Sequence, residues 1–490
     1  MISGMAAQTD PVPVKPAIVW FRRDLRIHDN QALIEACESG KPAIFLYILD
    51  ETADEPRPMG AAQRWWLHHS LASLSADLRK IGGTLLLRSG KTANAIENIL
   101  QETGSDWVLW NRRYDPAGIA ADTDLKNSLN GRGVRAVSYA GQLLHEPTQV
   151  RTLAGGPFKV YTPFWKAFSG FPEPRPPFEA PKALNGYRGP LASDNLDDWK
   201  LLPTEPDWAG GMREEWTPGE AGAHRRLTDF LETSIENYAD GRNVPGVQST
   251  SKLSPHLALG EVTPFQIWDA TRRLAQGIPP RDVEVFRKEV VWREFAHHLL
   301  FQFPKLATEN FNGSFDAFPW RSRPDLLGAW KRGQTGYPIV DAGMRQLWQT
   351  GWMHIRVRMI AASFLIKDLM TDWRVGEQWF WDTLVDACPA NNPASWQWVA
   401  GSGADAAPYY RVFNPVLQGE KFDANGDYVR QFVPEIANLP NAFVHRPWAA
   451  PAHELERAGV VLGATYPNPV VDHGQARDHA LAAYKALRTE

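Results

Sequence analysis

The first 140 residues contain five short apolar runs, and stretches with the residue spacing of amphipathic helices lie between them. The runs are rich in β-branched and aromatic residues, which favours strands, whereas the stretch 61–80 repeats its leucines near helical spacing. Strictly alternating strands and helices predict an α/β domain built on a doubly wound parallel five-stranded sheet. The five runs are AIVWF (17–21), AIFLYIL (43–49), TLLLRS (84–89), DWVLWN (106–111) and RAVSY (135–139).

The rest of the chain has a different pattern. Prolines and glycines crowd residues 148–218, which indicates an irregular connector between domains. From residue 219 onward long helical patterns replace the alternation. We therefore predict an α/β domain at 15–147, a connector at 148–218 and an all-α domain at 219–485.

Composition excludes several classes of protein. The 490 residues are 43% hydrophobic and 22% charged, as in globular proteins with more than one domain. The apolar runs are too short to span a membrane, and the N-terminus lacks the pattern of a signal peptide, so we expect a cytoplasmic protein that is preceded by a short disordered lead-in. Two cysteines cannot form an all-cysteine metal or iron-sulfur site, and the adjacent histidines of each pair, 68–69 and 297–298, point to different faces of a helix. We predict no metal site.

Two nucleotide-binding motifs match only in part. Gly90-Lys91-Thr92 follows a predicted strand, but the first glycine of a phosphate-binding loop is absent. The GSGADA segment at 401–406 fits a dinucleotide pattern but lies in the helical half. Hydrolase motifs are also lacking.

Residues 320–374 hold nine Lys or Arg against four Asp, inside a chain of net charge -4. Extended to residue 398, this stretch also contains nine tryptophans. Interleaved cations and aromatics suit a surface that reads phosphates and unstacked bases, and they equally suit a solvated basic face over a tryptophan-rich core. Composition leaves both interpretations open.

Longer motifs carry a family resemblance, in the same order and spacing from residue 17 to the C-terminus. The chain resembles the photolyase and cryptochrome flavoproteins, and within them the bacterial class III photolyases close to plant cryptochromes. That family implies an N-terminal α/β domain, a long connector and a helical domain that buries FAD. The motifs are WFRRDLRIHDN (20–30), TSKLSPHLALG (250–260), WREF (292–295), TGYPIVDAGMRQL (335–347), TGWMH (350–354), ASWQW (394–398) and APYYRVFNPVLQGEKFD (407–423).

The resemblance implies an FAD site. A loop of hydroxyls and backbone N–H groups would hold the diphosphate, an ion pair would lie beside the isoalloxazine, and Asn392 would face flavin N5. The implied FAD ligands are Tyr238, Thr250, Ser251, Lys252, Leu253, Ser254, Arg293, Arg358, Asp386, Cys388 and Asn392.

Two residues of this sequence depart from the family pattern. Cys388 stands where similar proteins have an aspartate near the flavin pyrimidine, and Ile355 replaces the asparagine that follows W-M-H. Each change removes hydrogen-bonding capacity. At Cys388 the loss affects the stability of the anionic flavin, and at Ile355 it removes a polar contact near flavin and substrate.

The resemblance also implies a substrate pocket and an electron path. Glu289, in its protonated form, would donate a hydrogen bond to a cyclobutane pyrimidine dimer, while a surface pair with Arg293 at i, i+4 is the ordinary alternative. Trp396, Trp373 and Trp320 match a tryptophan chain that reduces FAD in light. The other implied contacts with DNA or the dimer are Arg242, Trp292, Ile355, Arg356, Met359 and Trp398.

Light-driven repair of cyclobutane dimers is therefore the expected function. The alternatives are a blue-light photoreceptor that signals to a protein partner and repair of the (6-4) photoproduct. Against them, the chain ends without a long polar tail, and His354 is followed by Ile355 and not by a second histidine.

We also expect a monomer that flips the dimer out of DNA and associates with the nucleoid. An antenna chromophore, methenyltetrahydrofolate in preference to a deazaflavin, would lie against the α/β domain, although NRRYDPAG (111–118) lacks the Asn-Glu pair of some folate-binding relatives.

Overall fold

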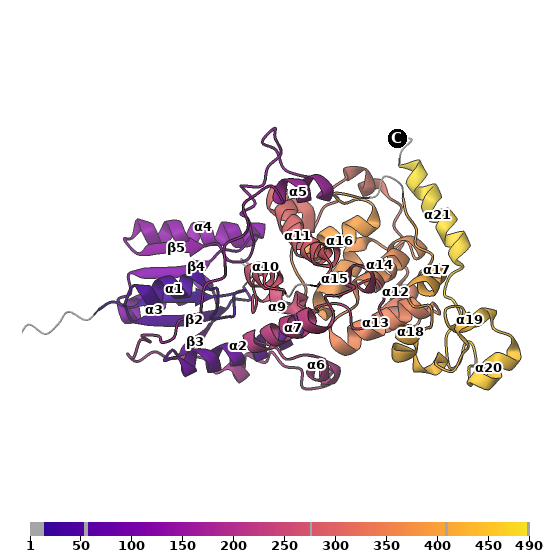
Figure 1. The fold of residues 1–490 in the computed structure, drawn as a ribbon, viewed down its shortest axis with the longest axis horizontal. Coiled ribbons are helices and arrows are strands. Elements are labelled where there is room, and N and C mark those ends of the chain that lie inside the picture. The colour runs from indigo at the N-terminus through magenta and orange to yellow at the C-terminus, as the bar shows by residue number, and fades with distance from the viewer. Residues whose placement is uncertain (1–13, 53–56, 275–276, 407–409, 488–490) are drawn as a thin grey trace, which may run out of the picture.

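The computed structural model describes residues 14–52, 57–274, 277–406 and 410–487. The lead-in expected at the N-terminus falls on residues 1–13, outside the described residues. Figure 1 places the sheet and its helices at one end of an elongated molecule and the helical domain at the other.

All five predicted strands form, and they make one parallel sheet in the order β3-β2-β1-β4-β5. In β1 every residue is buried, because helices cover both faces of the sheet, which explains why the strands read as continuous apolar runs and not as alternating ones. The predicted doubly wound α/β fold is confirmed. The strands are β1 (Ala17–Phe21), β2 (Ala43–Leu49), β3 (Leu85–Ser89), β4 (Trp107–Asn111) and β5 (Arg135–Tyr139).

Alternate residues of the strands face two different hydrophobic layers. Val19 and Phe45 pack with the tryptophans of α2, whereas Ile18 and Ile44 pack with α3. Local signals fix the ends of the helices: the side chains of Asn30 and Asp115 cap α1 and α4. The helices of this domain are α1 (Gln31–Glu38), α2 (Ala61–Lys80), α3 (Thr92–Thr103) and α4 (Pro116–Gly131).

The connector contains more regular structure than its composition predicts. A helix forms over α5 (Tyr161–Phe168), because Phe164 and Phe168 bury themselves in the core of the helical domain. Tertiary burial thus outweighs the local proline content. Two further short elements lie here, η1 (Leu196–Trp199) and α6 (Gly210–Glu215).

The helical domain follows, as predicted, and its described residues form three further core clusters. Its longest helix is α11, and α13 begins with Pro338 in its first turn and ends before Gly351, whose φ is +67°. Its α-helices are α7 (Glu220–Thr233), α8 (Tyr238–Gly241), α9 (Ser254–Ala258), α10 (Pro264–Arg272), α11 (Pro280–Gln302), α12 (Pro324–Arg332), α13 (Pro338–Thr350), α14 (Ile355–Ser363), α15 (Trp373–Thr383), α16 (Asn391–Ala400), α17 (Pro415–Phe422), α18 (Asp427–Phe432), α19 (Asn441–Val444), α20 (Ala452–Ala458) and α21 (His473–Ala486). Short 3-10 turns are η2 (Pro304–Ala307), η3 (Gly313–Ala317), η5 (Pro434–Ile436) and η6 (Pro447–Ala449), and η4 (Phe364–Asp368) is a π-helical turn that continues α14.

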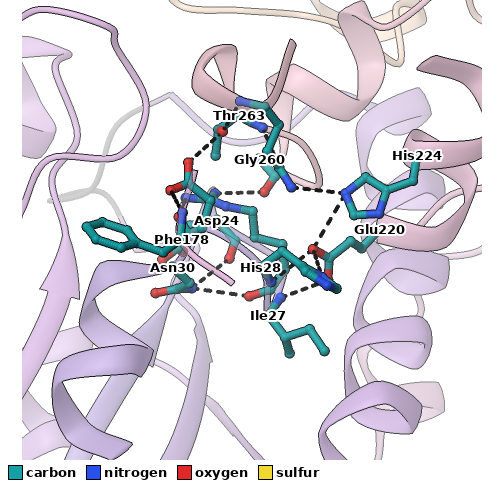
Figure 2. A network of polar contacts seen from close by, with 12 residues as sticks. Asp24, Ile27, His28, Asn30, Phe178, Glu220, His224, Gly260 and Thr263 are labelled. Atoms are coloured by element: carbon teal, nitrogen blue, oxygen red, sulfur yellow. Dashed lines mark hydrogen bonds and ion pairs between the residues drawn. The ribbon is translucent and has the colours of Figure 1, made fainter. Parts of the chain in front are cut away.

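Buried polar contacts join the two domains, as Figure 2 shows. Glu220 at the start of α7 accepts hydrogen bonds from the backbone N–H groups of Ile27 and His28, at 2.8 and 3.0 Å. Thr263 donates to the Asp29 carboxylate at 2.6 Å. His28, Glu220 and His224 lie close enough to surround a metal ion, but both oxygens of Glu220 already accept backbone hydrogen bonds. We therefore interpret these three residues as part of the contact between the two domains.

Among the described residues, no helix combines the length and apolar character needed to cross a membrane.

Candidate functional site

The loop Thr250–Ser254 precedes α9 and borders a cavity of about 240 Å³. Thr250 and Ser251 line this cavity together with Arg225 and Arg226 from α7. Hydroxyls, backbone N–H groups and guanidinium groups on one cavity wall suit an anionic group such as a diphosphate.

The other three residues of this segment, 252–254, make contacts with the protein itself. Lys252 has a φ of +48°, and its ammonium pairs with Glu215 at 2.8 Å. Leu253 is buried in the core, and the Ser254 hydroxyl accepts the indole N–H of Trp352 at 3.2 Å. Tyr238 is buried between aromatic rings, and this burial raises the pKa of its hydroxyl.

Arg358 and Asp386 form the predicted ion pair, with 2.8 Å between Nη2 and Oδ2. The other carboxylate oxygen of Asp386 is buried and has no protein partner. His354 Nδ1 accepts the N–H of Arg356, so Nε2 carries the proton, and this buried N–H is also unpartnered. Buried polar atoms without partners are rare, so this wall fits a polar ligand, as an FAD site requires.

The surroundings of His354 disfavour its protonated form. Burial, together with the charges of Arg356, Arg358, Arg242 and Lys252, lowers the pKa of His354 to about 3. His354 is therefore neutral, and its Nε2 N–H remains a donor for a ligand.

The segment that carries Asp386 continues to Cys388, and Asn392 follows in the first turn of α16. The Cys388 thiol lies 3.9 Å from Nε2 of His297 and accepts the N–H of Asn391 at 3.4 Å. Asn392 is buried, and its amide nitrogen donates to the side chain and the backbone carbonyl of Glu377, at 2.8 and 3.1 Å. No pattern in the sequence marks Glu377 as a site residue.

The charged rim, as we name Arg242, Glu289, Trp292, Arg356 and Met359, is brought together by α8, α11 and α14. Glu289 pairs with Arg242 at 2.5 Å, and their side chains remain 29% and 21% exposed. Burial raises the pKa of Glu289, and Arg242 opposes that rise. The alternative pair with Arg293 is wrong, because Arg293 donates instead to the carbonyl of Gln142 at 2.7 Å.

Trp292 lies in a stack that sequence reasoning missed. The ring of Tyr161, from α5 of the connector, lies parallel to the Trp292 ring at 3.6 Å with an interplanar angle of 8°. The Tyr161 hydroxyl donates to the carbonyl of Lys288, which fixes the stack on α11. One face of Trp292 is thus covered and its orientation set. A tyrosine in a proline-rich connector carries no signal of this role.

The remaining rim residues lie on α14. Arg356 donates to Asn243 Oδ1 at 2.5 Å, covers the ring of Phe422 and lies 3.9 Å from the Met359 sulfur. Its Nε is buried without a partner. Ile355, at the start of the same helix, is 41% exposed, so no hydrophobic contact explains the residue found there.

The tryptophan cluster, as we name Trp320, Trp373 and Trp396, is packed into one core with graded burial. Trp396 is 3% exposed and Trp373 is fully buried, whereas Trp320 is only partly buried. Trp373 donates its indole N–H to Asn310 at 2.9 Å. Gly376 lets α15 approach Trp396, because any side chain there would collide with the indole ring.

The structure places Trp398 in a small cavity and divides the basic residues of 320–374 among different contacts. Trp398 lines a small cavity with Lys367, Tyr410 and Arg411. Lys367 is buried, which lowers its pKa to about 7, and Arg345 pairs with Glu435 at 2.7 Å. The basic residues at 320–374 therefore do not form one continuous phosphate-facing stripe.

At the carboxyl edge of the sheet, arginines are paired with acidic groups of the same domain. Arg22 contacts Asp122 at 2.5 Å and also donates to the carbonyl of Asn111. Arg113 reaches the same aspartate at 3.0 Å, and Tyr114 donates to Glu146 at 2.7 Å. These contacts fill the position where open parallel sheets commonly bind ligands.

Comparison with known proteins agrees with this architecture. Residues 17–182 match the model of the DNA photolyase family, and residues 286–486 match that of the FAD binding domain of DNA photolyase. The chain is 56% identical to a deoxyribodipyrimidine photo-lyase of Agrobacterium fabrum, over 96% of this chain and 98% of the relative.

Two further comparisons define the branch. A bacterial class III photolyase from Agrobacterium tumefaciens has the same structure with a TM-score of 0.96 and 55% identity, covering 99% of this chain and 100% of the other. Cryptochrome-1 of Arabidopsis thaliana is 35% identical over 94% of this chain and 69% of its own length. The chain belongs to the photolyase and cryptochrome family, and it carries that family's FAD-binding domain.

Proposed function

We propose that this protein is a deoxyribodipyrimidine photo-lyase that repairs cyclobutane pyrimidine dimers in DNA with light. The observation that carries the proposal is the charged rim, where an acid with a raised pKa lies beside a fixed aromatic ring and two arginines. The full-length similarity to the Agrobacterium photo-lyase supports the same reaction.

FAD is held, in this proposal, by the implied ligands of the helical domain, residues 219–485. Thr250 and Ser251 would hold the diphosphate, and Asp386 and His354 would hold the polar edge of the isoalloxazine. The unpartnered atoms of these last two residues support the assignment. When bound, FAD supplies light absorption and reversible one-electron transfer to the dimer.

The rim residues orient the dimer. In our proposal the thymine bases leave the DNA stack and pack on the free face of Trp292, while Glu289 in its protonated form donates a hydrogen bond to a thymine carbonyl. For this step Arg242 must release Glu289, and a DNA phosphate would offer Arg242 a new partner. Met359 and Trp398 complete the walls, and Arg356 holds the DNA backbone.

We assign the tryptophan cluster to photoreduction. Trp396, Trp373 and Trp320 would pass electrons inward from the surface to FAD. Trp320 is the most exposed of the three, which supports its place at the surface end of this path.

The α/β domain, residues 15–147, holds the antenna chromophore in our proposal. We assign methenyltetrahydrofolate to this role in preference to a deazaflavin, on the resemblance to the branch of the family close to plant cryptochromes. We further propose that the protein acts as a monomer on DNA in the cytoplasm.

A blue-light photoreceptor is the second candidate, because Arabidopsis cryptochrome-1 is 35% identical to this chain. The intact rim favours repair, since a receptor that signals to a protein partner needs no acid and aromatic wall for a dimer.

The decisive experiment measures repair of an oligonucleotide that contains one thymine dimer, with FAD-loaded, chemically reduced protein, in blue light and in the dark. We expect thymines to be restored only in light. Bound, photoreducible FAD without any repair would contradict the proposal and favour the photoreceptor.

A further inference from the structure

The buried carboxylate of Glu377 links the two domains of the molecule to Asn392. Glu377 lies on α15, and its side chain is 7% exposed. Nη1 of Arg57, from the segment before α2 of the α/β domain, lies 2.8 Å from both carboxylate oxygens. The amide nitrogen of Asn392 donates to the same carboxylate at 2.8 Å.

Arg57 is held in place by the contact between its segment and α15. Its guanidinium covers the ring of Trp381 at 4.5 Å, and the indole N–H of Trp381 donates to the carbonyl of Pro58 at 2.7 Å. The N–H of Ala61 donates to Asp382 at 2.9 Å. The position of Arg57 therefore depends on how the α/β domain docks.

The donors around Glu377 require it to act as an acceptor. Arg57 Nη1 and Asn392 Nδ2 both point hydrogens at the carboxyl group, and a protonated carboxyl would place its own O–H against one of them. Burial raises the pKa of Glu377, and Arg57 and Asn392 oppose that rise. Arg57 is thus the charge that compensates an ionised Glu377.

An ionised Glu377 determines which end of the Asn392 amide faces away from it. The amide nitrogen is bound to the carboxylate and to the backbone carbonyl of Glu377, so the amide oxygen points elsewhere. A protonated Glu377 could donate to that oxygen and turn the amide round. The charge of Glu377 therefore decides whether the amide oxygen, an acceptor, or the amide nitrogen, a donor, of Asn392 faces away from Glu377.

We propose that Arg57, through Glu377, fixes the Asn392 amide with its oxygen toward flavin N5 and so stabilises the reduced state of FAD. This inference rests on the proposed FAD site, in which Asn392 faces N5. Two electrons and one proton added to oxidised FAD place a hydrogen on N5, and the amide oxygen accepts its hydrogen bond. Oxidised N5 is itself an acceptor, so the same oxygen disfavours it. Arg57, Glu377 and Asn392 are positioning residues, and the α/β domain takes part in setting the flavin potential.

The test is a reductive titration with dithionite, in which the midpoint potential of bound FAD is measured for each variant. We expect Arg57→Met to lower the ratio of reduced to oxidised FAD at a given potential about tenfold, or about 30 mV for a two-electron couple. Arg57→Lys keeps the charge and should stay near the wild-type value. The double variant Arg57→Met/Glu377→Gln removes both charges, yet should remain below the wild type because the amide is no longer oriented.

Two controls isolate this path. Arg88→Met removes a comparable arginine of the α/β domain, which pairs with Glu102 at 2.9 Å. Asp382→Ala weakens the same domain contact without touching Glu377. Arg88→Met should keep the wild-type potential, and Asp382→Ala should shift it by less than Arg57→Met. Binding of oxidised FAD to the FAD-free protein, measured in parallel by fluorescence titration, should not weaken in any variant.

Three results would overturn the inference: an unchanged potential in Arg57→Met, an equal shift in Asp382→Ala, or a double variant that returns to the wild-type value, which would mean that the pair acts by charge alone. A wild-type protein that binds FAD and repairs dimers while showing any of these results contradicts the inference but not the proposed function. A wild-type protein that binds no FAD contradicts both.

Discussion

The charged rim and the tryptophan cluster lie in the same helical domain but are built in opposite ways. The rim combines charged side chains that keep part of their exposure, such as the pair of Arg242 and Glu289, with Trp292 and Met359. The cluster consists of indole rings packed into one core, in which Trp373 is fully buried and Trp320 only partly. A partly exposed ion pair can open when a ligand offers new partners, whereas packed rings cannot move. The rim is therefore suited to binding, and the cluster to fixed distances for electron transfer.

The largest expected effect separates the two regions at Trp373. Replacing Trp373 with Phe keeps a buried ring but removes the indole that the electron path requires. We expect photoreduction of oxidised FAD, followed by absorbance under blue light, to fall at least 100-fold while FAD remains bound. Trp348→Phe, at an exposed tryptophan outside the cluster, is the matched control. Unchanged photoreduction in Trp373→Phe would assign the electron path to other residues.

The next effect concerns the acid of the rim. Glu289→Ala removes the proposed hydrogen bond and leaves a buried thymine carbonyl without its partner, which costs about 1–3 kcal/mol, or roughly 5- to 150-fold. We expect the affinity for dimer-containing DNA, measured by fluorescence anisotropy, to fall by this amount, with no change in photoreduction. Glu284→Ala, on the same helix but exposed and paired with Lys288, should leave affinity near the wild-type value. Equal losses in the two variants would remove Glu289 from the site.

The pH dependence of stability tests the buried environment of His354 beside the rim. The folded pKa of His354 is about 3, below its ordinary value of 6.5, so the unfolded chain binds a proton that the folded chain does not. The stability from this residue is complete above pH 6.5 and is lost as the pH falls toward 3. It should cost about 2 kcal/mol at pH 5 in the FAD-free protein. Urea unfolding at pH 7 and pH 5 should show a smaller difference for His354→Asn. An equal difference in both proteins would mean that folding does not lower the pKa of His354 to this extent.

The smallest effect concerns the stack behind Trp292. Tyr161→Ala leaves one face of Trp292 uncovered, and an aromatic pair of this kind contributes about 0.5–1.5 kcal/mol. We expect dimer affinity to fall roughly 2- to 10-fold, while Tyr161→Phe keeps the ring and most of the affinity. If Tyr161→Phe were as weak as Tyr161→Ala, the hydroxyl bond to Lys288 and not the ring stack would position Trp292.

The sequence predicted those features that depend on local pattern. The strands were visible because they are buried on both faces, and the pair of Arg358 with Asp386 followed from the family motifs. The partner of Glu289 was not visible, because Arg242 lies 47 residues away in sequence, whereas the nearby Arg293 is bound by a backbone carbonyl.

Contacts made across domains were also missed. Tyr161 lies in a proline-rich connector, and Arg57 lies in a loop of the other domain; neither position has a periodicity that marks a function. Their roles arise only when the chain folds back, Tyr161 onto Trp292 and Arg57 onto Glu377. Local patterns thus predict elements, while a site assembled from several elements needs their arrangement in space.

Repair by Trp373→Phe protein whose FAD has been reduced chemically tests the division between the two regions most directly. If the rim binds the dimer and the tryptophan cluster only supplies electrons to oxidised FAD, this variant should repair a thymine dimer in blue light at the wild-type rate. A large loss of repair with fully reduced FAD would show that the cluster takes part in the repair step itself, and would contradict the division proposed between rim and cluster.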